Sequence, residues 1–170
     1  MFAIYYVANL ENVILQTFDS IELEGKLANL RGECLCGKIR YEYNGPTGNL
    51  VHCHCSKCRK WHGAAFRSRI VIKADGYRLT RGQEYLARYQ ATPNVIKTSC
   101  KNCGSSLATI YPLRDNLLGL PIAGCEGEFN CDREFHIFVG SKARWWQIAD
   151  DAVQYKDLPD NPEIIHCIND

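Results

Sequence analysis

Cysteine is the residue type whose spacing in this sequence points most directly to chemistry. The 170-residue chain has 10 cysteines, a high count for its size. Thiolates two or three positions apart can reach one zinc ion from a tight turn, and protein-bound zinc takes four ligands in a tetrahedron. Seven of the cysteines form three such clusters, Cys34-Leu35-Cys36, Cys53-His54-Cys55-Ser56-Lys57-Cys58 and Cys100-Lys101-Asn102-Cys103.

The first and third clusters have a feature in common that indicates how the ligands divide. Each is followed at once by a glycine, Gly37 or Gly104, and glycine adopts a positive φ without a Cβ clash. This likeness predicts that the two clusters share one zinc ion and hold together two segments that are distant in the sequence. The expected ligands of this structural zinc are Cys34, Cys36, Cys100 and Cys103.

The middle cluster then supplies three cysteines of its own. Cys53, Cys55 and Cys58 would leave one position of a second zinc open, which is the pattern of catalytic zinc. His52 and His54 are alternative fourth ligands, but His54 lies between two ligands on a short turn. We therefore expect its ring to point away from the metal.

Simpler explanations of the cysteines also exist. Some pairs of the clusters could be free core thiols or a disulfide. Cys125, Cys131 and Cys167 fit no cluster, and we interpret them as ordinary buried or surface thiols.

Positive charge accumulates around the middle cluster. No Asp or Glu occurs between Cys53 and Asp75, whereas the same stretch contains Lys57, Arg59, Lys60, Arg67, Arg69 and Lys73. Cations favour the thiolate over the thiol and attract anionic ligands. Arg59 and Lys60 directly follow the last cysteine and, with Trp61, are the predicted substrate contacts. The alternatives are a solvated basic face and, for Trp61, ordinary packing.

The expected ligand set suggests a reaction class. Three thiolates donate charge to zinc and reduce its Lewis acidity, so a soft fourth partner such as a thiolate suits the open position. A substrate thiol there would stay ionised near neutral pH. Such a thiolate could add to an aldehyde or be released from a thiohemiacetal.

Short strands separated by Gly, Pro and Asn would position these cysteines. Ile39, Tyr41 and Tyr43 alternate with polar residues, as in a half-buried strand, and Asn44-Gly45-Pro46 predicts a turn after it. One helical turn is predicted over 56–62, with Ser56 as its N-cap. Further strands are expected at 70–72, 77–80, 85–89, 107–111 and 136–139.

We therefore predict a mainly β fold of stacked antiparallel sheets, with little helix and two zinc sites. The domain is expected over 31–160, between an N-terminal extension (1–30) of unknown role and a C-terminal tail (161–170).

Composition excludes some classes of protein. A net charge of +1 argues against a protein that mainly coats nucleic acid or an anionic membrane. The first 16 residues contain no Lys or Arg, so the basic region of a signal peptide is absent. We expect a soluble protein of a reducing compartment, the cytoplasm, without a membrane partner; the sequence leaves homo-oligomerisation open.

The ordered motifs resemble a known family, the glutathione-dependent formaldehyde-activating enzymes, which also includes centromere protein V. The resemblance covers roughly residues 31–160. It rests on Gly32-Glu33-Cys34-Leu35-Cys36-Gly37-Lys38-Ile39-Arg40-Tyr41, His52-Cys53-His54-Cys55-Ser56-Lys57-Cys58-Arg59-Lys60, Cys100-Lys101-Asn102-Cys103-Gly104-Ser105 and His136-Ile137-Phe138-Val139-Gly140-Ser141-Lys142-Ala143-Arg144-Trp145.

The resemblance implies the same division of ligands and a labile catalytic zinc. It implies a carbon–sulfur lyase that forms the hydroxymethyl adduct of glutathione from formaldehyde, so glutathione or a similar small thiol is the expected partner. Two other functions stay open. One is a non-catalytic zinc module that binds a protein or nucleic acid, and the other is a redox switch that releases metal from the middle cluster.

Overall fold

The computed structural model of the chain describes residues 27–113, 116–131 and 133–159. Most of the expected N-terminal extension, Cys167 and the tail over 161–170 lie outside these ranges. The described chain is mainly β, which confirms the predicted fold class. Its strands are β1 (Leu27–Glu33), β2 (Arg40–Cys53), β3 (Arg67–Lys73), β4 (Tyr77–Arg81), β5 (Leu86–Thr92), β6 (Val95–Cys100), β7 (Ser106–Ile110), β8 (Leu117–Pro121), β9 (Cys125–Glu126), β10 (Glu134–Ile137) and β11 (Val153–Gln154).

Helix is confined to short pieces in the described ranges. One is α1 (Ser56–His62), over the residues predicted to form a helical turn, and three are 3₁₀ turns, η1 (Gln83–Tyr85), η2 (Ile122–Gly124) and η3 (Val139–Ser141). The N-cap prediction is wrong by one residue. The cap is Cys55, whose side chain accepts a hydrogen bond from the Cys58 N–H. No described helix has the length and apolarity that crossing a membrane requires.

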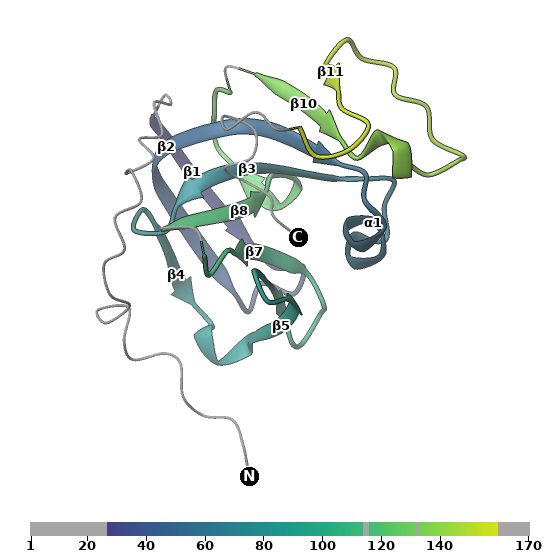
Figure 1. Cartoon of the computed structure of the whole chain (residues 1–170). Helices are drawn as coiled ribbons and strands as arrows, with labels where there is room; N and C mark the ends of the chain where they lie inside the picture. The colour runs from purple at the N-terminus through teal and green to yellow at the C-terminus, as the bar shows by residue number, and fades with distance from the viewer. Residues whose placement is uncertain (1–26, 114–115, 132, 160–170) are drawn as a thin grey trace.

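The long strand β2 belongs to two layers of sheet. Its first half pairs antiparallel with β1 and β4, and its second half pairs antiparallel with β3 and parallel with β10. The second layer continues in the order β11-β10-β2-β3-β8-β7-β6-β5. Figure 1 shows β2 running across the molecule and α1 following its end. Because β2 follows the first cysteine cluster and ends at Cys53, it fixes the separation of two clusters.

The hydrophobic core fills the space between these layers. Leu30, Ile39 and Tyr43 contribute from the first layer, and Ile70 and Leu120 from the second, all 0% exposed. The alternation predicted for Ile39, Tyr41 and Tyr43 is thus the inward face of a half-buried strand.

The turn predicted at Asn44-Gly45-Pro46 is wrong, because β2 continues through it. β1 pairs across this segment, with Leu27 opposite Pro46. A bulge between Thr47 and Leu50 follows at once, and proline is tolerated beside bulges. The Tyr43 hydroxyl donates to the Pro46 carbonyl and fastens the bend.

Two glycines with positive φ provide a test of how tightly the β4–β5 connection packs. Gly82 has φ 80°, and a Cβ there would lie 2.0 Å from the Lys38 carbonyl oxygen beside the first cysteine cluster. Gly63 has φ 58° but nothing within 4 Å of such a Cβ. Gly63→Ala should cost about 1 kcal/mol of unfolding free energy through backbone strain alone. Gly82→Ala should cost about 1–3 kcal/mol more through overpacking. Urea unfolding of both variants measures this, and equal losses would contradict the close contact.

Candidate metal centres and active site

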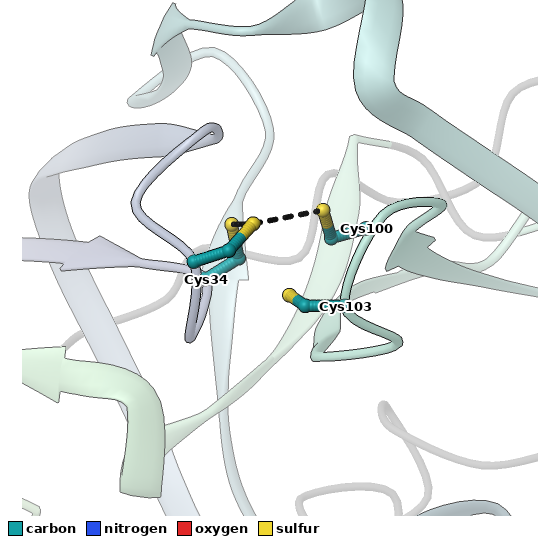
Figure 2. Close-up of side chains that lie close together, drawn as sticks. Cys34, Cys100 and Cys103 are labelled. Carbon is teal, nitrogen blue, oxygen red and sulfur yellow. Dashed lines mark hydrogen bonds between the residues drawn. The ribbon is translucent and has the colours of Figure 1, made fainter.

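The first and third cysteine clusters meet at one point, as predicted. The ligand atoms of Cys34, Cys36, Cys100 and Cys103 all lie within 4.8 Å of one another. The Cys36 Sγ atom lies 3.5 Å from that of Cys34 and 3.9 Å from that of Cys100. Figure 2 shows Cys34 approaching from one strand connection, and Cys100 and Cys103 from another, with their sulfurs directed inward. Four ligands at ~2.3 Å in a tetrahedron are separated by about 3.8 Å, so these positions fit a zinc ion.

Two similar turns present these sulfurs. The Gly37 N–H donates to the Cys34 carbonyl, and the Gly104 N–H to the Cys100 carbonyl, each at 2.8 Å. Both glycines have positive φ, 68° and 77°, which confirms their predicted conformation. The Leu35 N–H donates to Ser105 Oγ at 2.8 Å and so connects the two turns directly.

Hydrogen bonds to sulfur make this group ready to bind a cation. The Cys103 pKa is lowered to about 6, first by the Ser105 hydroxyl and then by the Ser105 backbone N–H. The Cys36 pKa is also lowered, chiefly by the Lys38 backbone N–H. Metal binds the thiolate form, so these donors favour metal binding.

The middle cluster forms a second group of three sulfurs. The ligand atoms of Cys53, Cys55 and Cys58 lie within 4.8 Å of one another. Cys53 ends β2, Cys55 caps α1 and Cys58 lies in the first turn of the helix. Cys53 and Cys58 are buried, whereas Cys55 is half-buried. Among the described residues no fourth His, Cys, Asp or Glu joins the group. Three thiolates alone would leave one position of a four-coordinate zinc ion to another ligand.

Charge in this second group concentrates on one sulfur. The pKa of Cys58 lies far below its usual value, chiefly because Cys53 and Cys55 hydrogen-bond to its thiolate, with added attraction from Arg67 and Lys97. The pKa of Cys53 rises well above its usual value, because its hydrogen bonds to the other two sulfurs stabilise its thiol form and because it is buried. Hydrogen bonds between the sulfurs therefore stabilise the Cys58 thiolate most, and side-chain cations add to this effect.

The neighbouring histidines bind one another instead of the three-sulfur group. His54 Nε2 lies 2.8 Å from His136 Nδ1, and His136 Nε2 lies 3.0 Å from Asp150 Oδ1. His52 Nε2 lies 2.5 Å from Glu134 Oε1. Burial, and then repulsion by His136, lower the His54 pKa to about 4. The chain Asp150–His136–His54 fixes the peptide between the first two cysteines of the cluster.

The predicted substrate contacts occupy different positions around α1. Arg59 Nε donates to the His54 carbonyl at 3.2 Å, and Lys60 is exposed. Trp61 donates from Nε1 to Ser106 Oγ at 3.0 Å and stacks on Tyr89, with ring centroids 5.8 Å apart. The Lys97 Nζ atom lies 5.7 Å from the centroid of the Trp61 ring.

A pocket beside the three sulfurs includes residues that sequence reasoning missed. Arg67 and Arg69 belonged to the predicted basic stretch, but Lys97, Thr109 and Tyr111 lie about 40 or more positions beyond the cluster and reach it through sheet pairing. The sequence contains one signal that could have indicated Lys97. In a strand, Val95 and Lys97 lie on the same face, so an inward-facing valine would imply an inward-facing lysine. The lining residues are Cys53, Cys58, Arg67, Arg69, Val95, Lys97, Thr109 and Tyr111.

Comparison with known proteins identifies the family. The profile described as glutathione-dependent formaldehyde-activating enzyme matches residues 29–141, and the chain belongs to this family. A Schizosaccharomyces pombe protein named as an uncharacterized lyase is 28% identical over 80 residues, which is 47% of this chain and 56% of that protein. The chain thus spans about half the length of that relative. A solved Rhodobacter sphaeroides protein is similar with a TM-score of 0.48 and 20% identity, over 74% of this chain and 98% of that one.

Removal of one cysteine from each group should separate their roles. Cys34→Ser is expected to lose one zinc ion and to lower the thermal midpoint by roughly 10 °C, because that site joins two distant turns. Cys55→Ser is expected to lose one zinc ion with a change of only a few degrees. Metal analysis and calorimetry measure both, with Cys131→Ser as the control that keeps two ions. Equal destabilisation by Cys34→Ser and Cys55→Ser would contradict this division.

The histidine pair predicts a coupling between two substitutions. His54 Nδ1 already has no hydrogen-bond partner, so His136→Phe leaves the buried ring with none, at a cost of about 1–3 kcal/mol. The double variant with His54→Phe removes both partners and should lose at least about 1 kcal/mol less than the two single losses combined. Urea unfolding at matched metal content measures the cycle. Simple additivity would mean that this contact contributes nothing.

Proposed function

We propose that the chain is a zinc-dependent carbon–sulfur lyase that acts on the adduct of an aldehyde with glutathione or another small thiol. The observation that supports it most is the three-sulfur group with no fourth protein ligand among the described residues. Family membership over residues 29–141 and the word lyase in the name of the yeast relative agree with it.

The seven cysteines of the two groups would bind two zinc ions with different roles. Cys53, Cys55 and Cys58 would hold the catalytic zinc, and Cys34, Cys36, Cys100 and Cys103 the structural one. A thiolate-rich zinc, when bound, keeps an incoming thiol ionised near neutral pH. Nearby cations, Arg67 and Lys97, offset the charge of the sulfurs.

The proposed reaction is balanced without a redox partner. In the direction of synthesis, the thiol loses its proton, a carbon–sulfur bond forms at the aldehyde carbon, and the carbonyl oxygen takes up a proton. The reverse direction breaks the same bond and is the lyase reaction. The histidine chain behind the cluster keeps its peptide in place and thereby holds the three sulfurs in position.

The non-catalytic zinc module is less consistent with the site. Arg67 and Arg69, which made the stretch after the middle cluster look basic, are 3% and 1% exposed. Buried cations cannot reach the phosphates of a nucleic acid, so these two arginines do not contribute to a surface for that partner, and Lys57 and Lys60 are the exposed cations of the stretch.

The function is tested by Cys55→Ser in a thiol-exchange assay. Exchange between free formaldehyde and its glutathione adduct, followed by two-dimensional NMR exchange spectroscopy, should be accelerated by the metal-loaded protein. Because outer partners of a metal site alone affect activity 10–100-fold, loss of a ligand should reduce the acceleration by at least about 100-fold. Cys131→Ser is the matched control and should keep it. An unchanged rate in folded Cys55→Ser would overturn the proposal.

A further inference from the structure

The short helix α1 sets the position of two of the three sulfurs in the second group. Cys55 is its N-cap, and Cys58 lies in its first turn. The helix has only 7 residues, and helices this short are not stable by themselves in water. The geometry of the three-sulfur group therefore depends on the contacts that hold α1 against the sheet.

One face of α1 carries both a sulfur and an aromatic side chain that reaches the sheet. Ser56, Lys57 and Lys60 are exposed and form the outer face, whereas Cys58 is buried. Residues three positions apart lie on the same face of a helix, so Trp61 lies on the side of Cys58, and it is half-buried. A contact made by Trp61 therefore acts on the face from which the Cys58 sulfur projects.

Trp61 extends from this face to the strands β5, β6 and β7. Its Nε1 atom donates to the Oγ atom of Ser106, the first residue of β7, at 3.0 Å. Its ring stacks on Tyr89 of β5 with an interplanar angle of 11°. Tyr89 lies opposite Lys97 of β6, whose Nζ atom lies 5.7 Å from the centroid of the Trp61 ring. Three strands thus contribute to the surface on which α1 rests.

Ser106 joins this surface to the four-sulfur group. It directly follows Ser105, whose Oγ atom lies 3.3 Å from Cys103 Sγ and whose carbonyl accepts from the Cys100 N–H at 2.9 Å. Two consecutive residues therefore reach the two sulfur groups. Ser105 contacts the first group directly, and Ser106 reaches the second through Trp61.

The contacts of Trp61 indicate which role it has. The sequence predicts it as a substrate contact, but its one hydrogen-bond donor is the indole N–H, which Ser106 already engages. These contacts favour a role in holding α1 over a role in binding a polar group of a substrate.

We propose that Trp61 is a positioning residue of the three-sulfur group. By holding α1 against β5, β6 and β7, it keeps the Cys58 sulfur at the separation from the other two sulfurs that one metal ion requires. Partners outside the ligand set commonly change the affinity of a metal site in this way. The proposal rests on the proposed function only in taking these three cysteines as the ligands of the catalytic zinc. Trp61 is expected to control metal affinity, which is measured without turnover.

Competition between the protein and a chelator measures this affinity. The protein is loaded with Cd²⁺ in place of zinc, since thiolates prefer soft ions, and cadmium NMR follows the two groups separately. Trp61→Phe keeps an aromatic ring but removes the donor, and Ser106→Ala removes the acceptor. Each should weaken Cd²⁺ binding at the three-sulfur group about fivefold or more, as expected for the loss of one hydrogen bond. The affinity of the four-sulfur group should stay within about twofold.

Matched variants show whether this one bond is responsible. Ser106→Thr keeps the hydroxyl and should keep the affinity. Trp145→Phe makes the same exchange at an indole that is 73% exposed and should change neither group. The double variant of Trp61→Phe with Ser106→Ala should lose less than the two single losses combined, because both remove the same bond. Unchanged affinity of the three-sulfur group in both single variants, or equal weakening of both groups, would overturn the proposal.

The titration also separates this inference from the proposed function. Unaltered protein that binds Cd²⁺ at the four-sulfur group alone would overturn both, because α1 would then have no ion to position. Two bound ions whose affinities do not respond to Trp61→Phe or Ser106→Ala would remove the positioning role and leave the lyase. The expected loss of affinity, without accelerated thiol exchange in the zinc-loaded protein, would leave the positioning role and remove the lyase.

Discussion

Repulsion between thiolates is the constraint to which the rest of this structure responds. Seven sulfurs gather in two small groups, in each of which they lie within 4.8 Å of one another, and sulfurs so close together cannot all ionise without nearby positive charge. Each group has its own response. At the first, backbone N–H groups and the Ser105 hydroxyl hydrogen-bond to sulfur. At the second, Cys53 and Cys55 hydrogen-bond to the Cys58 sulfur, and the cations of Arg67 and Lys97 add their attraction. A divalent ion would complete the neutralisation at both.

The strand β2 connects the two cysteine groups and the two layers of sheet. It begins just after the turn that presents Cys34 and Cys36, bends at the bulge before Leu50, and ends at Cys53. The same strand therefore joins one layer to the other and one cysteine group to the next. Substitutions at its bend would therefore be transmitted toward both groups.

The ligand groups could be predicted from the sequence because their chemistry is local. Cys53 and Cys58 lie within six residues, and the glycines after the other clusters mark turns that the structure contains. The partners across the sheet could not be predicted, because register depends on tertiary pairing. Lys97 reaches the site only because β6 pairs with β7 and β7 with β8. The turn predicted at Asn44-Gly45-Pro46 is absent, because pairing with β1 keeps this segment in a strand.

The two ways of stabilising thiolates have different consequences for function. Backbone donors belong to turns whose conformation is fixed, so at the first group they can only hold sulfur or metal in place. Side-chain cations such as Arg67 and Arg69 belong to β3 and line a pocket next to the second group. The four-sulfur group therefore suits a fixed joint between two turns, whereas the three-sulfur group is joined by no fourth His, Cys, Asp or Glu from the described part of the chain.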